Sequence, residues 1–156
     1  MELHALQLHA WISSQVSAVR RGLGQLVPLA VLQLFTAEEL ERLVCGEADW
    51  DVTELRKHAV VSCSAGRAAH LWKALGEFSR EERQLFVRFA WGRSRLPLGG
   101  SYRFRLNEHN VDDPDAHLPT AGTCFFQVTI PKYTNYASLK AKLLYAIYNC
   151  RDMDLC

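Results

Sequence analysis

The chain has 156 residues, the length of one ordinary domain, and 49% of them are apolar, which supports a buried core and argues against disorder. With 18 basic and 17 acidic residues, its charge balance gives no general attraction to nucleic acid or anionic lipid. No apolar run is long enough to span a bilayer and no signal-peptide pattern is present, so we expect an intracellular, cytoplasmic protein without membrane insertion, with a nuclear location left open.

Helices dominate the predicted elements in the first part of the chain. Apolar periodicity and capping signals predict them over residues 3–21, 28–34, 36–45, 52–58, 67–75 and 79–91. Three begin with a capping box, in which two residues satisfy each other's backbone N–H groups: Thr36 with Glu39, Asp51 with Glu54, and Ser79 with Glu82. The leading helix is expected to expose apolar surface.

Strand patterns appear only after the Leu-Pro-Leu-Gly-Gly segment at 96–100, which cannot be helical. Residues 102–106 alternate apolar with basic side chains, as a strand with one solvated face does. A polar, acidic turn over 107–117 follows, then an apolar strand over 124–130 and a last helix over 136–149. This order, helices before strands, predicts an α+β fold with helices packed on a small β-sheet.

The five cysteines, Cys45, Cys63, Cys124, Cys150 and Cys156, are an odd number without a Cys-x-x-Cys pair. They indicate reduced thiols, and neither a disulfide framework nor a zinc ribbon. The histidines show no metal-ligand spacing, so no metal and no cofactor are expected.

Cys124 is the candidate nucleophile, because it lies between the loop 118–123 and an apolar run. Such a junction can expose a thiol while the strand behind it holds it in place. A thiol can accept an acyl group from another thiol without a neighbouring base, since some thiolate is present at neutral pH. The residues alone leave open that Cys124 is the first buried residue of a strand. His117 is the nearest candidate base, or an exposed loop histidine.

The sequence around Cys124 resembles the active-site signature of HECT ubiquitin ligases, through Leu118-Pro119-Thr120-x-x-Thr123-Cys124-Phe125 and Pro131-x-Tyr133. Four further blocks are similar to that family in order and spacing: Leu43-Val44-Cys45-Gly46, Phe78-Ser79-x-Glu81-Glu82-Arg83, Gly92-x-Ser94-Arg95-x-Pro97 and Leu139-x-x-Lys142-Leu143. The Gly92–Pro97 block and the Asn149-Cys150 ending resemble the large HERC-like members.

This resemblance implies a domain order: the helical end of an N-lobe over 1–45, a hinge over 46–49, and a C-lobe with the active-site cysteine over 50–156. Composition alone favours a plain turn at 46–49. The resemblance also implies ubiquitin transfer from an E2 ubiquitin-conjugating enzyme to a substrate lysine. Cys124 would carry the thioester, and Thr123, Thr120 and Met153 would position it. The implied partners are ubiquitin, an E2 and a protein substrate, and no nucleic acid.

Three features depart from the family pattern. Gly122 stands where the family often has histidine, and Met153 where many members have phenylalanine. Most of the N-lobe, which docks the E2, lies outside this sequence, so we expect this segment alone not to recruit E2 in the usual way. Two other functions stay open: a binding module for ubiquitin or another partner with an inert Cys124, and a cysteine hydrolase that pairs Cys124 with His117.

Overall fold

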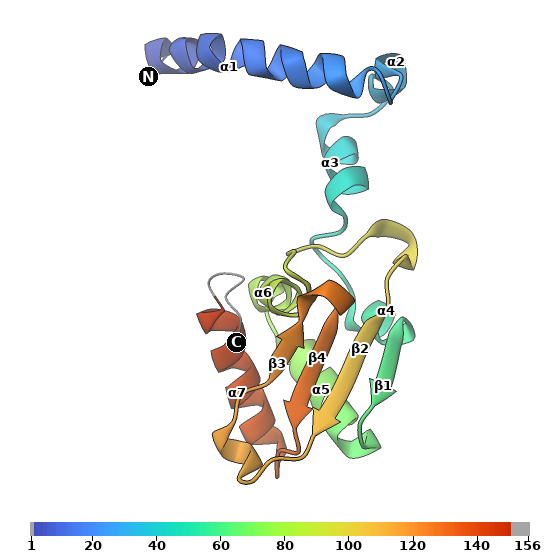
Figure 1. Cartoon of the computed structure of the whole chain (residues 1–156), viewed down its shortest axis with the longest axis vertical. Helices are drawn as coiled ribbons and strands as arrows, with labels where there is room; N and C mark the ends of the chain where they lie inside the picture. The colour runs from blue at the N-terminus through green and yellow to red at the C-terminus, as the bar shows by residue number, and fades with distance from the viewer. Residues whose placement is uncertain (1, 151–156) are drawn as a thin grey trace. The chain divides into compact units, whose positions relative to one another are not determined.

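The computed structural model describes the backbone of residues 2–150 and the side chains of residues 11–150. Its helices are α1 (Glu2–Leu23), α2 (Leu29–Leu32), α3 (Ala37–Cys45), α4 (Val52–Lys57), α5 (Ala65–Glu77), α6 (Arg80–Trp91) and α7 (Tyr136–Asn149). Its strands are β1 (Ala59–Ser62), β2 (Phe104–His109), β3 (Thr120–Gly122) and β4 (Gln127–Pro131) (Figure 1). The predicted α+β class is therefore confirmed. Over the described residues, no helix combines the length and the apolar character needed to cross a membrane.

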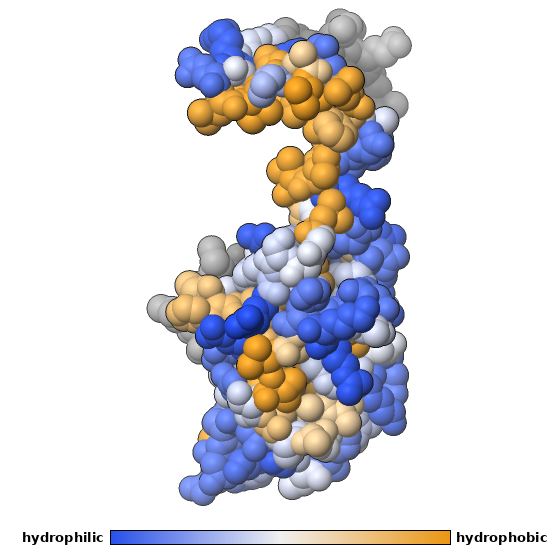
Figure 2. All heavy atoms as spheres, turned by 90° about the vertical axis from the view of Figure 1, so that its right-hand side faces the viewer, coloured by the Kyte–Doolittle hydropathy of each residue, from blue (hydrophilic) through white to orange (hydrophobic). Residues whose placement is uncertain are grey.

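The chain divides into two compact units, Met1–Glu41 and Arg42–Cys156. In the first unit no side chain between residues 11 and 41 is fully buried. An apolar groove runs along α1 and α2, lined by Val16, Val19, Leu23, Leu29 and Leu32 among others. Figure 2 shows apolar side chains gathered on this unit, which confirms the expected apolar surface of the leading helix.

The second unit is built on a four-stranded sheet with strand order β1-β2-β4-β3. β1, β2 and β4 run parallel, and β3 is antiparallel to β4. In Figure 1 the helices α5 and α6 lie behind this sheet. The opposite face carries Arg105, Asn107, Gln127 and Thr129, which are exposed or half-buried. The sheet thus has one face in the core and one polar face.

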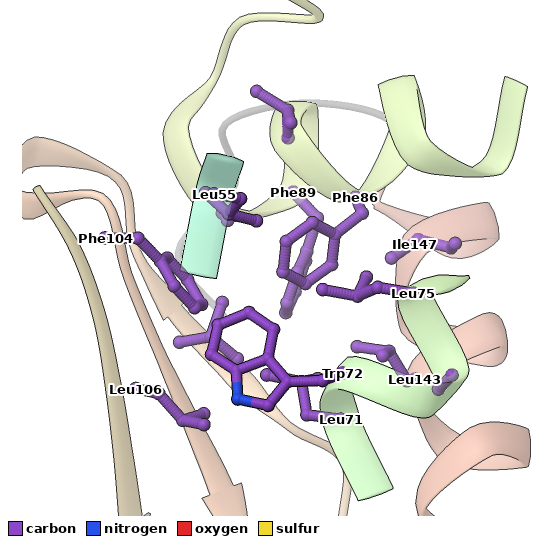
Figure 3. Packing of buried hydrophobic residues seen from close by; sticks show 14 of the residues in the cluster. Leu55, Leu71, Trp72, Leu75, Phe86, Phe89, Phe104, Leu106, Leu143 and Ile147 are labelled. Atoms are coloured by element: carbon purple, nitrogen blue, oxygen red, sulfur yellow. The ribbon is translucent and has the colours of Figure 1, made fainter. Parts of the chain in front are cut away.

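The core lies between the sheet and the helices α4, α5, α6 and α7. Figure 3 shows Trp72, Leu75 and Phe86 from the helices facing Phe104 and Leu106 from β2. The Phe104 ring packs edge-on against Trp72 and Phe86, with centroids 6.0 and 5.9 Å apart. Edge-to-face contacts of this kind add to the stabilisation that burial of the rings provides.

Local sequence explains where several helices begin. Both capping-box bonds are present at the start of α3 between Thr36 and Glu39, and at the start of α6 between Ser79 and Glu82. The capping box predicted at α4 is wrong, because the Asp51 carboxylate accepts from the Thr53 backbone N–H and not from that of Glu54. Asp51 still caps the helix, through the adjacent donor.

All four strands differ from the prediction. The sequence predicts no strand at β1 and a loop at the residues of β3, and β2 extends to His109 where the alternation ends at residue 106. The strand predicted from Cys124 begins at Gln127 instead, because residues Thr123–Phe125 form a 3-10 turn, η3. Two further 3-10 turns are η1 (Leu98–Gly100) and η2 (Pro114–Ala116). Cys124 is therefore in a turn, and not in a strand.

Candidate functional site

The thiol of Cys124 is exposed on the turn that connects β3 with β4. The turn closes with the Phe126 backbone N–H donating to the Thr123 carbonyl at 3.5 Å. Among residues 11–150, the Cys124 thiol makes neither a hydrogen bond nor a disulfide. The interpretation of Cys124 as a buried strand residue is thus wrong, and the thiol is accessible to a reaction partner.

Phe126 fixes this turn to the body of the unit. Its backbone is left-handed, with φ of 47°, and its side chain is only 2% exposed. Its ring stacks on that of Trp91 at the end of α6, with centroids 4.4 Å apart and ring planes 7° apart. Its carbonyl accepts a 2.9 Å hydrogen bond from the Arg105 backbone N–H. A left-handed conformation is costly for a bulky residue, so this packing must hold it there.

Two guanidinium groups lie over aromatic rings close to the turn. The Arg105 guanidinium is 6.0 Å from the centroid of Phe125, which directly follows Cys124 and is 65% exposed. The Arg93 guanidinium is 4.5 Å from the centroid of Trp91. Sequence reasoning identified neither contact. The alternation over 102–106 indicated that Arg105 lies on the solvated face, but it could not indicate which ring it covers.

Several hydrogen bonds hold the segment that precedes β3, at Asp115 and His117, in place. The Tyr133 hydroxyl, on a residue that is 3% exposed, donates to the His117 carbonyl at 2.9 Å. Burial raises the pKa of Tyr133 and keeps this hydroxyl a donor. The Asp115 carboxylate accepts from the backbone N–H and hydroxyl of Thr134, and these bonds lower the pKa of Asp115. This anchoring fixes where β3 starts.

The predicted positioning residues fall at different places relative to Cys124. Thr123 is half-buried in the same turn. Thr120 is exposed at the other end of β3, where it pairs with Thr129. Met153 lies outside the described residues. Of these three, the structure places only Thr123 in the cysteine turn.

His117 is not assembled with Cys124 into a hydrolase site. It lies before β3, whereas Cys124 follows that strand, and its ring nitrogen Nδ1 contacts the Asp113 carbonyl at 3.1 Å. Three strand residues at about 3.3 Å each separate the two ends of β3. Among residues 11–150, the Cys124 thiol has no hydrogen bond to an imidazole of the kind that a cysteine hydrolase needs. The described residues also contain no group of three or more His, Cys, Asp or Glu side chains that could hold a metal ion.

The segment predicted as a hinge, 46–49, is bound to the connection between α6 and β2. Glu47 and Leu96 form an isolated antiparallel bridge, with Glu47 N–H to Leu96 O at 2.6 Å and Leu96 N–H to Glu47 O at 3.0 Å. Gly46 has φ of 91°, and a Cβ there would lie 2.2 Å from the Leu96 carbonyl oxygen. The Glu47 carboxylate pairs with Arg42 at 2.8 Å.

A family model and individual relatives both relate this chain to ubiquitin ligases. The family model described as HECT-domain (ubiquitin-transferase) matches residues 2–156. The chain is 39% identical over 158 residues to the E3 ubiquitin-protein ligase HERC2 of Mus musculus and to that of Homo sapiens, covering 95% of this chain. It is 34% identical over 146 residues to the E3 ubiquitin-protein ligase UPL4 of Arabidopsis thaliana, covering 87% of this chain. The chain spans 3% of either HERC2 protein and 10% of UPL4.

Proposed function

Because this chain belongs to the HECT-domain (ubiquitin-transferase) family, we propose that Cys124 accepts ubiquitin as a thioester and passes it to a lysine of a protein substrate. In the first step the Cys124 thiolate attacks the carboxyl carbon of an incoming ubiquitin thioester. A new S–C bond forms, and the thiolate of the donor leaves. In the second step the neutral amine of the lysine attacks the same carbon. A C–N bond forms, Cys124 leaves as a thiolate, and the proton lost by the amine passes to that thiolate or to solvent.

The exposure of the Cys124 thiol carries this proposal. Acyl exchange between thiols needs an accessible sulfur and exchanges one thiolate for another, so it does not require a neighbouring imidazole. The buried Phe126 ring holds the turn behind this sulfur, and a fixed nucleophile loses less freedom when the reaction partner docks. Thr123 belongs to the same turn and is the residue best placed to orient the thioester.

The relatives, which are named as E3 ubiquitin-protein ligases, support a proposal about partners. We propose that the whole protein takes ubiquitin from an E2 ubiquitin-conjugating enzyme, and that the E2 docks on sequence outside this chain. Met153 is a further proposed positioning residue, as the counterpart of the phenylalanine that many family members carry near the C-terminus.

A test that does not require an E2 uses ubiquitin activated as a small-molecule thioester. The chain is mixed with this reagent and resolved on a non-reducing gel, beside Cys124→Ala and the matched variant Cys45→Ala, which removes another exposed thiol. We expect a thiol-sensitive ubiquitin adduct that is lost in Cys124→Ala and kept in Cys45→Ala. An adduct that persists in Cys124→Ala, or no adduct with the unaltered chain, would contradict the proposal.

The alternative is a binding module in which Cys124 is inert, and Gly122 in place of the family's histidine is the observation that favours it. Such a module would bind ubiquitin non-covalently and equally well with cysteine or alanine at position 124. The same gel, combined with a titration of unactivated ubiquitin, separates the two functions, since only the transferase forms the adduct.

A further inference from the structure

Two cationic side chains lie close to the cysteine turn. Arg93 and Arg105 are exposed, and each guanidinium is held over a ring that belongs to the turn or packs behind it. Among the described residues, neither forms an ion pair with a carboxylate. Burial raises the pKa of Tyr102, and the negative charge of Glu54 raises it further. The Glu54 carboxylate is itself paired with Lys57.

The aromatic rings place these cations without neutralising them. A guanidinium over a ring face is attracted by the ring quadrupole, while the N–H groups at its edge stay available to an acceptor. Phe126 occupies one face of the Trp91 ring, so Arg93 lies over the other, and the stack Phe126–Trp91–Arg93 runs from the core to the surface. Arg105 is attached directly behind the turn by its backbone bond to Phe126.

From this placement we infer that Arg93 and Arg105 form a cationic rim beside Cys124, which recognises acidic segments of the protein that approaches the thiol. The inference deepens the proposed function, on which it rests for the identity of that protein: the substrate with its acceptor lysine. A lysine ammonium is itself repelled by the rim. Aspartate or glutamate residues next to the lysine would pair with the two guanidinium groups and offset that repulsion. The rim would therefore favour acceptor lysines with acidic neighbours.

The rim can be measured without ubiquitin, by thiol–disulfide exchange with small reagents of different charge. The reagents are dithiodipropionate, which is anionic, and cystamine, which is cationic, with hydroxyethyl disulfide as the neutral reference. Rates are read at Cys124 and, as an internal standard, at the exposed Cys45, by mass spectrometry of the modified peptides. We expect the anionic-to-cationic rate ratio to be about fivefold higher at Cys124 than at Cys45, the size that two exposed charges can produce. It should fall as salt is raised, because salt screens exposed charges.

Substitutions test whether Arg93 and Arg105 cause the higher rate ratio at Cys124. The double variant Arg93→Gln with Arg105→Gln should bring the ratio at Cys124 down to that at Cys45. The matched control Arg80→Gln removes an exposed cation at the opposite end of α6 and should leave the ratio unchanged. Equal ratios at the two thiols of the unaltered chain, or a ratio that survives the double variant, would overturn the inference.

A second arm separates this inference from the proposed function. The ubiquitin-charged chain is offered two peptides with one lysine each, flanked by aspartates or by arginines, and discharge of the thioester is followed. Faster discharge onto the aspartate-flanked peptide, lost in the double variant, supports acceptor selection, and equal rates overturn it. If no thioester forms, the proposed function and acceptor selection both fail. The rates of thiol–disulfide exchange with the charged reagents then decide alone whether the rim recognises acidic segments.

Discussion

The rings of Trp91 and Phe126 lie nearly parallel, with centroids 4.4 Å apart, and join the end of α6 to the residue that closes the cysteine turn. Phe125 and Phe126 are adjacent in sequence but have opposite environments: the first is 65% exposed and the second 2%. The left-handed backbone of Phe126 turns one ring to the surface and the other into the core. These two residues therefore have separable roles in stability and in recognition.

Replacement of Phe126 by alanine should destabilise the fold by about 3 kcal/mol, because it leaves a cavity against Trp91 and Phe104. Phe125→Ala is the matched control and should change the free energy of unfolding by less than about 0.5 kcal/mol. Urea unfolding followed by tryptophan fluorescence measures both. Equal losses for the two variants would contradict the role assigned to the Trp91–Phe126 stack.

Gly46→Ala should destabilise the second unit by about 2–4 kcal/mol. An added Cβ would lie 2.2 Å from the Leu96 carbonyl, and the φ of 91° is unfavourable for any residue with a side chain. The control is Gly66→Ala in α5, where a Cβ meets nothing within 4 Å and helix propensity should add about 0.5–1 kcal/mol of stability. Chemical denaturation of the pair should give changes of opposite sign.

Gly122→His, which introduces the residue that the family often has, should be tolerated. The φ of Gly122 is −109°, and a Cβ there would meet the Gln127 Cβ at 3.6 Å, an ordinary contact. We expect a change in unfolding free energy below about 0.5 kcal/mol. We also expect adduct formation with activated ubiquitin at least as fast as in the unaltered chain. A large loss of stability would show that the turn requires glycine at this position.

Acid should weaken the link between β2 and α5. The Arg67 side chain donates to the Glu108 carboxylate at 2.7 and 3.2 Å, and these bonds lower the pKa of Glu108 below its ordinary 4.5. A carboxyl group with a lowered pKa stabilises the fold fully above its unfolded pKa, and loses that contribution as pH falls through the folded value.

The variant Glu108→Gln should therefore be less stable than the unaltered chain by about 0.5–1 kcal/mol at pH 7, because the pair is partly exposed. The difference should shrink below pH 4.5. Urea unfolding at a series of pH values measures it, with the exposed Asp112→Asn as control. A difference that is constant down to acid pH would exclude the ion pair as its source.

Local sequence predicted the helices well, because caps and periodicity act over a few residues. Ser79 and Glu82 satisfy each other's backbone groups, so α6 could be placed from its first turn alone. The last helix, α7, matches the predicted range 136–149 because Leu139, Leu143 and Ile147 keep their helical spacing and are buried.

The strands around the site depended on contacts that the sequence does not display. β1 is a four-residue edge strand, and its pairing with β2 joins Ala59 to Phe104 across 45 positions of sequence. The apolar run at 124–130 resembles one continuous strand. In the structure the Phe126 ring stacks on Trp91 and is buried, whereas the Phe125 ring is exposed. The junction of a loop with an apolar run therefore indicated the cysteine and the strand that follows, whereas tertiary packing determined the turn that exposes it.

The bridge between Glu47 and Leu96 also has a mechanical consequence. Tension applied to the polypeptide at Gly46 would reach two backbone hydrogen bonds before it reached α4. Part of the load would pass through Leu96 toward the segment that leads into β2, whose neighbour β4 begins just after the cysteine turn. The Glu47–Leu96 bridge would thus bear part of a pulling force before that force reached the short helix α4.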